Sequence, residues 1–264
     1  MPLEEKYLQL LSAFLPDVIG QEEKERFSLL YDRVVETNKQ INITSLVSPI
    51  DVTLKHFLDS LTLFMNDEFR GEVATGKKIC DIGCGGGFPG LPIASLVPEV
   101  PLTMIDSTEK KIAALRENAS FLGLNHITAV WGRGEELASA KGGKYREKFD
   151  ICVSRAVASL PVLCELCLPF VRVGGTFYAM KGMKALEEVE MSKKAIPMLG
   201  GVLKDVQDIH PDPSLIDTSL FSDEEKNKIE EFFSSSRYLV IIEKKKPTMP
   251  IYPRKWAQMT KKSL

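Results

Sequence analysis

The residues from Ile79 to Gly90 have the types and spacing of a loop that binds a cofactor through its main chain. A short apolar run ends in Asp81, glycines follow at positions 83, 85, 86 and 87, and Pro89 introduces what is expected to be a helix. Glycines have no Cβ, so the chain can turn sharply and a ligand can approach the backbone closely. We therefore predict a nucleotide-like cofactor at this loop.

Two cofactor classes compete for this loop. Gly85, Gly87 and Gly90 match the dinucleotide pattern G-x-G-x-x-G, but Pro89 falls inside the match and its first glycine comes late after the strand. The alternative pattern, D-x-G-x-G-x-G of class I S-adenosylmethionine-dependent methyltransferases, is met by Asp81, Gly83, Gly85 and Gly87. In that pattern the acid pairs, usually through water, with the ammonium group of the cofactor. The methyltransferase pattern is favoured over an NAD site and over a glycine-rich turn without a ligand.

A second acid follows at the distance expected for a nucleotide site. Asp106 ends the next apolar run, roughly 20 residues after the loop, where an acid can hold the ribose hydroxyls. Asp106 is also a candidate N-cap of the helix that begins around Glu109, and after the glycine loop both roles are expected, with ribose binding favoured. We expect Asp106 to bind the ribose.

The cysteines do not indicate a metal site. Cys80 and Cys84 straddle the cofactor loop, and Cys164 and Cys167 have helical spacing in an apolar segment. Buried thiols are therefore expected in place of zinc ligands, and no metal is predicted. Cys152 falls inside an expected strand, which favours burial over a role as a nucleophile.

The elements that position these residues follow from the periodicity of the chain. Up to about residue 68 the apolar residues have helical spacing, and from Lys77 strands alternate with helices. This predicts an α/β fold of the class I methyltransferase type: a Rossmann-like, mostly parallel seven-stranded sheet with helices on both faces. The expected parts are a helical extension (1–70), a Rossmann-like domain (71–246) with a surface insertion (210–236), and a basic tail (247–264). The expected strands are 79–81, 102–106, 126–131, 149–154, 176–181, 202–209 and 237–244.

Composition limits the class of protein. The chain has 264 residues, a formal net charge of −2 and five cysteines. No run approaches the roughly 20 apolar residues of a membrane span, and the acidic amino-terminal segment is unlike a signal peptide. We expect a cytoplasmic protein, a monomer without a membrane partner. The near-neutral charge argues against a general nucleic-acid coat but permits a local basic patch.

Beyond the loop, several stretches resemble one family, in this order: Asn42-Ile43-Thr44, HFLDSL (56–61), DIGCGGGFPGLPIA (81–94), GRGEEL (132–137), SRAVASL (154–160) and YPRK (252–255). From about Tyr31 onward the chain is similar to ribosomal RNA small subunit methyltransferase G, also called glucose-inhibited division protein B. The resemblance implies S-adenosylmethionine-dependent methylation of guanine N7 in small-subunit (16S) ribosomal RNA. It also implies cofactor contacts, which fall on Gly83, Phe88, Gly134, Glu135 and Arg155. This chain departs from the family at Gly134, where alanine is usual, and in its tail after Lys255.

The chemistry of the residues agrees with that reaction. Guanine N7 has a lone pair and no proton, so its methylation needs positioning and no general base. The N-P-P-Tyr/Phe motif that usually serves amino-group methylation is absent after the fourth strand, where Ser154-Arg155-Ala156 stands. Arg155, at the carboxyl end of this strand, is the candidate catalytic residue. It is expected to clamp the cofactor or to stack on the target base, with a surface salt bridge as its alternative role.

Other basic residues are candidates for RNA contacts, either at the mouth of the site or at phosphates. They are His56, Arg133, Lys181, Arg254 and Lys255. Whether naked ribosomal RNA or an assembling small subunit is the substrate stays open. Two rival functions also remain, a nicotinamide-dependent oxidoreductase and an RNA-binding scaffold. S-adenosylhomocysteine would bind only the methyltransferase, and NAD only the oxidoreductase.

Overall fold

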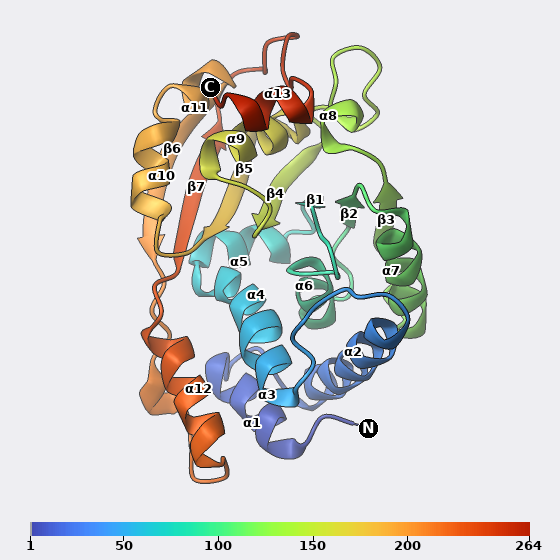
Figure 1. The fold of residues 1–264 in the computed structure, drawn as a ribbon, viewed down its shortest axis with the longest axis vertical. Coiled ribbons are helices and arrows are strands. Elements are labelled where there is room, and N and C mark those ends of the chain that lie inside the picture. Colours follow the sequence, from blue (N-terminus) through green and yellow to red (C-terminus); the bar gives the residue numbers. More distant parts are fainter. Residues whose placement is uncertain (1) are drawn as a thin grey trace.

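The computed structural model describes residues 2–264 and is built on one seven-stranded sheet (Figure 1). Along the sheet the strands follow the order β3-β2-β1-β4-β5-β7-β6, which places β1 beside β2 and β4. The strands are β1 (Ile79–Ile82), β2 (Leu102–Asp106), β3 (Ile127–Trp131), β4 (Phe149–Arg155), β5 (Val171–Lys181), β6 (Gly201–Asp208) and β7 (Tyr238–Lys244).

Strand direction determines where the site can form. β1 to β5 pair in parallel, whereas β7 runs antiparallel to both β5 and β6. The carboxyl ends of the parallel strands therefore meet at one edge, and the start of β7 reaches the same edge. The predicted fold class, a mostly parallel seven-stranded sheet with helices, is confirmed.

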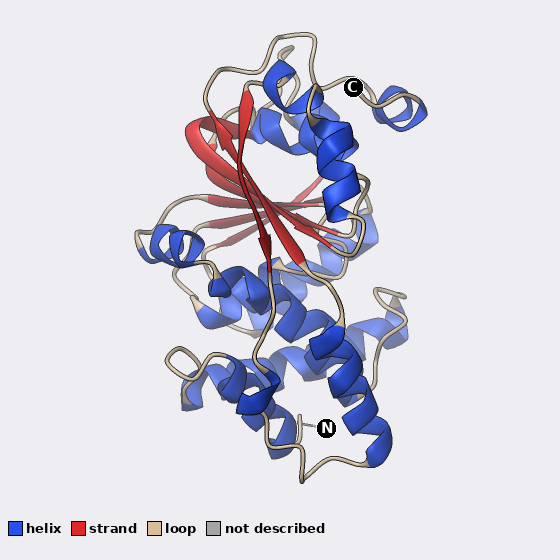
Figure 2. Cartoon of the chain, turned by 90° about the vertical axis from the view of Figure 1, so that its left-hand side faces the viewer, coloured by secondary structure: helices blue, strands red, loops and turns tan. Residues whose placement is uncertain are grey.

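Alternate residues of the central strands enter two different hydrophobic cores, as the two-residue period of a strand requires. In β4, Ile151 and Val153 join the core on the side of the amino-terminal helices, while Cys152 joins the core on the opposite side. Helices cover both faces of the sheet (Figure 2). Burial on both sides explains why these strands are nearly continuous apolar runs in the sequence.

The helices are positioned by the two cores, and several begin at ordinary capping residues. Ser48 Oγ accepts from the Asp51 amide and Pro49 occupies the first turn of α3, while Asn66 caps α5 in the same way. The α-helices are α1 (Glu5–Phe14), α2 (Gln21–Gln40), α3 (Pro49–Val52), α4 (Asp59–Leu61), α5 (Asp67–Ala74), α6 (Gly90–Leu96), α7 (Glu109–Phe121), α8 (Gly134–Leu137), α9 (Leu160–Cys167), α10 (Ala185–Ser192), α11 (Ala195–Met198), α12 (Asp223–Ser234) and α13 (Trp256–Lys261).

The helical spacing before residue 68 does not produce one continuous helix between α3 and α5. Between α3 and α4 lies a π-helical turn, Thr53–Leu58, and a 3₁₀ turn, Thr62–Met65, follows α4. π-helical turns are rare and occur often at functional sites. This one contains His56, and α4 begins with Asp59.

The amino-terminal helices, the sheet and the 210–236 insertion pack into one core. Phe221, Ile229 and Phe232 of the insertion join the same hydrophobic cluster as Tyr7 of α1. An ion pair of 3.0 Å joins Lys6 to Glu225 at its edge. The insertion therefore covers the helical layer of residues 1–70, with α12 beside α1 in Figure 1.

The carboxyl-terminal segment is folded onto the sheet domain, although the sequence suggested a basic tail. Arg146 donates to the carbonyl oxygens of Thr248 and Tyr252, and Met259 of α13 is fully buried. Lys244, also fully buried, donates to Leu168 O and Thr248 Oγ1. In residues 2–264, no helix has the length and apolar character that crossing a membrane requires.

Candidate functional site

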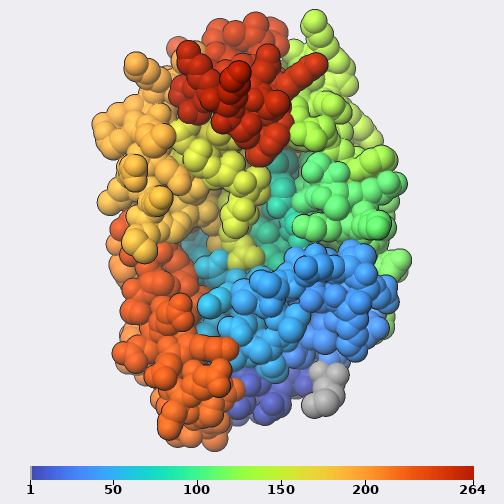
Figure 3. Space-filling view, in the orientation of Figure 1, coloured from blue at the N-terminus to red at the C-terminus, as the bar shows by residue number. Residues whose placement is uncertain are grey.

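Two cavities lie next to each other along the carboxyl edge of the sheet. The first, of about 660 Å³, is lined by residues that follow β1, β2, β3 and β4. The second, of about 430 Å³, is lined by residues at the ends of β4 and β5 and the start of β7. Arg155 and Ala156 line both. In Figure 3 the face of the molecule is hollowed in its middle, between the blue amino-terminal helices and the green and yellow segments.

The glycine loop forms the floor of the first cavity. Gly83 has φ of +75°, and a Cβ at this position would lie 2.4 Å from Val157 Cγ2. Both the backbone conformation and the space therefore exclude a larger residue. Because Val157 follows Ala156, which itself has φ of +57°, the loop after β1 and the turn after β4 fit together closely. Such strained non-glycine residues cluster at functional sites.

Asp81 lies beneath this floor and is completely buried. Its Oδ2 accepts a hydrogen bond of 2.9 Å from the Gly90 amide at the start of α6. Its Oδ1 has no hydrogen-bond partner among the described residues. Burial raises the pKa of Asp81 from 3.8 to about 7, and the nearby charge of Asp106 adds to this effect. Asp81 is a buried carboxylate with one oxygen left for a further donor.

Asp106 projects into the first cavity from the end of β2 and orders the loops around it. Its Oδ2 accepts from the Gly85 amide at 2.9 Å, and its Oδ1 accepts from the Thr108 amide at 2.8 Å. Thr108, not Asp106, is the N-cap of α7. The helix-cap role expected of Asp106 is therefore wrong, whereas both carboxylate oxygens retain acceptor capacity for a ligand.

The opposite wall contains Gly134 and Glu135 of α8 and, unexpectedly, Trp256 of α13. Glu135 Oε1 accepts from Arg133 Nε at 2.8 Å and from the Trp256 amide at 3.2 Å. A Cβ on Gly134 would lie 2.9 Å from Leu166 Cδ1, so glycine suits the spacing between α8 and α9 here. Glu135 thus joins the start of α13 to the cavity wall.

His56 and Phe88 stack face to face at the side of the cavity that borders the helical layer. Their ring centroids are 4.3 Å apart and the planes differ by 8°. His56 Nε2 lies 2.8 Å from Thr44 Oγ1, and Nδ1 lies 3.5 Å from Arg155 Nη2. Burial and the charge of Arg155 lower the pKa of His56 to about 4, so the imidazole is neutral at neutral pH.

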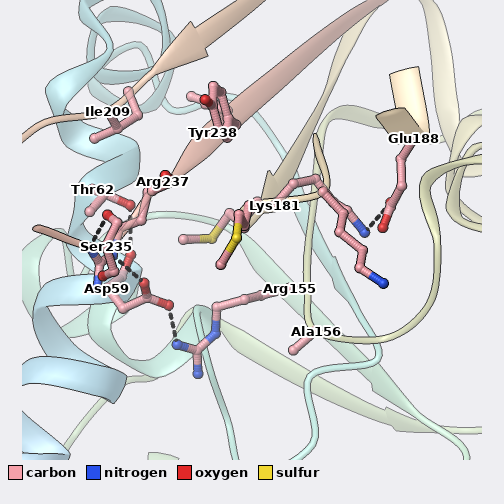
Figure 4. Close-up of a pocket in the computed structure, with 16 residues that line it drawn as sticks. Asp59, Thr62, Arg155, Ala156, Lys181, Glu188, Ile209, Ser235, Arg237 and Tyr238 are labelled. Carbon is pink, nitrogen blue, oxygen red and sulfur yellow. Dashed lines mark hydrogen bonds and ion pairs between the residues drawn. The ribbon is translucent and has the colours of Figure 1, made fainter. Parts of the chain in front are cut away.

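Arg155 is held by the interrupted helix. Its Nη1 donates to Lys55 O at 2.8 Å and to Asp59 Oδ2 at 2.6 Å. The other oxygen of Asp59 accepts from Arg237 Nε at 3.0 Å, so one carboxylate serves two arginines (Figure 4). Arg155 does form an ion pair, but at 14% side-chain exposure it is not the surface salt bridge of the alternative interpretation.

The structure brings most of the predicted site residues together and separates a few. The first cavity is lined by Gly83, Gly85, Phe88, Asp106, Arg133, Gly134, Glu135, His56 and Arg155. Gly87 does not line it, and Asp81 lies below it. Lys181 lines the second cavity, where its Nζ pairs with Glu188 at 2.6 Å.

Arg254 and Lys255 line neither cavity. Nε and Nη2 of Arg254 donate to the carboxylate of Glu165, whose side chain is 1% exposed. Both nitrogens therefore serve a buried acid, and a phosphate contact through this side chain stays a prediction. Lys255 is exposed.

Sequence reasoning missed three residues of the two cavities, which are Asp59, Arg237 and Trp256. Asp59 had a usable signal, since it follows His56 by three residues and helical spacing places both on one side. Arg237 and Trp256 had no such signal in the sequence, because only the fold brings them to the edge of the sheet.

All five cysteines are free and buried, and burial raises the pKa of the Cys80, Cys84 and Cys152 thiols. The prediction of buried thiols is confirmed. Residues 2–264 contain no group of three or more His, Cys, Asp or Glu side chains arranged to hold a metal ion.

Comparison with known proteins identifies close relatives. The family model described as rRNA small subunit methyltransferase G matches residues 23–216. The chain is 39% identical over 248 residues to a ribosomal RNA small subunit methyltransferase G of Lactobacillus johnsonii, covering 93% of each chain. It is 40% identical over 240 residues to the protein of the same name from Desulfitobacterium hafniense, covering 91% of this chain and 89% of that one.

Among solved structures, the chain is similar to a branched-chain polyamine synthase mutein of Thermus thermophilus in complex with N4-aminopropylspermidine and 5′-methylthioadenosine. The TM-score is 0.53 at 13% identity, over 83% of this chain and 64% of that one. This likeness concerns the fold alone.

Proposed function

Because this chain belongs to the rRNA small subunit methyltransferase G family, we propose that it transfers a methyl group from S-adenosylmethionine to N7 of a guanine in small-subunit (16S) ribosomal RNA. The observation that carries the proposal is the pair of adjoining cavities that share Arg155 and Ala156. One cavity has the parts of a nucleoside site, and its neighbour lies where an acceptor can approach.

The residues of the first cavity fit S-adenosylmethionine. Asp106 offers carboxylate oxygens to the ribose hydroxyls, and the loop at Gly83 and Gly85 leaves the backbone open to the ligand. Asp81 has one buried oxygen without a partner, which suits the cofactor's ammonium group reached through water. The positive charge of that group would also favour the ionised form of Asp81.

Trp256 completes the cofactor cavity from the far end of the sequence. Its amide donates to Glu135 Oε1, and the side chain lines the cavity beside Gly134. An aromatic ring with an indole N–H can pack against a purine and remain partly wet. We include Trp256 among the residues that hold the adenosine part of the cofactor.

The boundary between the cavities suits an acceptor that has no proton to lose. Bound S-adenosylmethionine would supply an electrophilic sulfonium methyl. The N7 lone pair would form the new N–C bond as the C–S bond breaks, with sulfur keeping the electron pair and the positive charge passing to the purine. Arg155 cannot accept a proton at neutral pH and Ala156 has no ionisable group. Neutral His56 is occupied by Thr44 and stacked on Phe88. The chain's part is to position the base in line with the methyl group.

The test uses small-subunit ribosomal RNA and small-subunit particles from a strain that lacks this gene, incubated with the purified protein and methyl-labelled S-adenosylmethionine. We expect label in 7-methylguanosine after nucleoside digestion and one new borohydride- and aniline-dependent strand break. RNA from the parent strain is the matched control, because its site is already methylated and should accept no label. Label in another nucleoside, or none in either substrate, would refute the assigned reaction.

A further inference from the structure

The second cavity is a separate chamber on the same edge of the sheet. Besides Arg155 and Ala156, its wall comes from the ends of β5 and β6, the start of β7, and the regions of α4 and α10, and none of these other residues lines the first cavity. Figure 4 shows Asp59 with its arginines on one side of the chamber, and Lys181 with Glu188 on the other. The two cavities meet only at Arg155 and Ala156.

The chamber carries an excess of positive charge. Four basic side chains face two carboxylates, which leaves two positive charges without compensation at the wall. The basic residues are Arg155, Lys181, Lys184 and Arg237, and the acids are Asp59 and Glu188. Lys181 and Glu188 satisfy each other at 2.6 Å. Lys184 is exposed and forms no ion pair with any residue of the described part of the chain.

The Arg237 side chain is held in place, but some of its hydrogen-bond donors have no acceptor among the described residues. Its Nε donates to Asp59 Oδ1 at 3.0 Å, its Nη1 donates to Ser235 O at 3.0 Å, and its guanidinium stacks on Phe232 at 3.7 Å. Within residues 2–264, its Nη2 has no acceptor. A planar guanidinium held on one side with donors left on the other is well suited to a phosphate, because little side-chain entropy remains to be lost.

The remaining wall is apolar and contains two thioethers. Met180, Ile209 and Leu239 line the chamber, and Met183 is 83% exposed at this site. Methionine is flexible and polarisable, so it adapts to flat aromatic groups. Apolar and sulfur-containing surface beside unpaired cationic donors can receive a base together with its phosphate.

We propose that the second cavity holds one nucleotide of the RNA that has left its stack, with the base against the methionine wall and the phosphate on Arg237 and Lys184. The inference rests on the proposed function, because the shared wall at Arg155 brings that base next to the cofactor cavity. A volume of about 430 Å³ lies within the range of sites for single small ligands. Asp59 acts as the common counter-ion that keeps both arginines in position before RNA arrives.

The first experiment measures binding of guanosine 5′-monophosphate and of guanosine to the protein loaded with S-adenosylhomocysteine, by calorimetry. We expect the nucleotide to bind roughly tenfold more tightly than the nucleoside, the effect of one charge-assisted hydrogen bond. Arg237→Gln should reduce this preference while affinity for S-adenosylhomocysteine stays unchanged. Equal affinity for nucleotide and nucleoside in the wild-type protein would overturn the proposal.

The second experiment avoids any question of folding, because it uses the exposed Lys184. Lys184→Gln should weaken binding of a small-subunit ribosomal RNA fragment and reduce its log–log salt slope by roughly 0.7, the value for one single-strand phosphate contact. Lys194→Gln is the matched control, since it makes the same charge change at an exposed residue just before α11 and outside the cavity. Identical slopes for both variants would overturn the phosphate role of Lys184.

The two proposals fail in different ways. If the wild-type protein produces 7-methylguanosine and the Arg237 and Lys184 variants keep the wild-type KM for RNA, the nucleotide cavity is refuted and the reaction stands. If no 7-methylguanosine forms, the reaction itself is refuted. A raised KM for RNA at unchanged S-adenosylhomocysteine affinity supports the nucleotide cavity.

Discussion

Replacement of Arg254 by alanine separates a structural role from an RNA contact. The Arg254 side chain donates through Nε at 2.8 Å and through Nη2 at 2.5 Å to Glu165, whose side chain is 1% exposed. Breaking a buried ion pair by removing one partner costs about 3–5 kcal/mol, because the other charge stays buried. The guanidinium is 25% exposed, and the amide of residue 254 still donates to Glu165 Oε1. We therefore expect a loss of about 3 kcal/mol, at the lower end of that range.

For a chain of this size, such a loss lowers the melting temperature by roughly 6–12 °C. Thermal unfolding followed by calorimetry or circular dichroism measures it. Lys255→Ala is the matched control, because this neighbouring side chain is exposed and should leave the melting temperature unchanged. Adding Glu165→Gln to Arg254→Ala should recover part of the loss, since the buried charge is then gone. A variant with wild-type melting temperature and weakened RNA binding would show that Arg254 is an RNA contact after all.

Three further predictions concern the cofactor cavity. Asp81 has a pKa of about 7 in the folded protein against 3.8 ordinarily, so its contribution to stability is complete below pH 3.8 and is lost as the pH rises to 7. In urea unfolding, the free energy of unfolding of Asp81→Asn should therefore rise relative to that of the wild type by roughly 4 kcal/mol between these two pH values. A difference that does not change with pH would contradict the buried acid. Of the two tryptophans, only Trp256 lines the cavity, so Trp256→Phe should abolish the change in tryptophan emission on binding S-adenosylhomocysteine, whereas Trp131→Phe should retain it; the reverse result would place the cofactor elsewhere. Asp106→Ala should weaken S-adenosylmethionine binding by about 1–3 kcal/mol in calorimetry, and unchanged affinity would limit Asp106 to supporting the Gly85 and Thr108 turns.

The central strands of the sheet were predictable because they are buried on both faces. β4 and β7 differ from the predicted ranges by one residue at one end, since each is a continuous apolar run. β5 was predicted to begin at 176 but begins at Val171. The glycines at 174 and 175 suggested a turn, but the strand passes through them with a shift in its pairing to β4. A Cβ at Gly175 would lie 2.5 Å from Asp150 O, so this glycine serves close approach within the sheet.

The cofactor loop was predictable because its chemistry is local, whereas the other walls of the site are not. Asp81 and Gly83 lie within a few residues of each other and act through the backbone of one turn. By contrast, Glu135 meets the Trp256 amide across 121 residues of sequence. The segment after Lys255 is mostly polar and basic, and its burial depends on Met259 against α9, a contact that no local pattern indicates.

The insertion of residues 210–236 helps the amino-terminal helical layer to fix side chains at both cavities. Lys228 of α12 pairs with Asp51 of α3 at 3.0 Å, and the π-helical turn that follows α3 leads directly to Asp59. The same insertion ends at residue 236, directly before Arg237, whose Nη1 donates back to Phe232 O of α12. Asp59 and Arg237 are therefore fixed against each other from two sides of one ion-paired helical layer, and Arg155 is fixed by Asp59 in turn. The 210–236 insertion thus helps to determine where the guanidinium groups of Arg155 and Arg237 lie at the boundary of the two cavities.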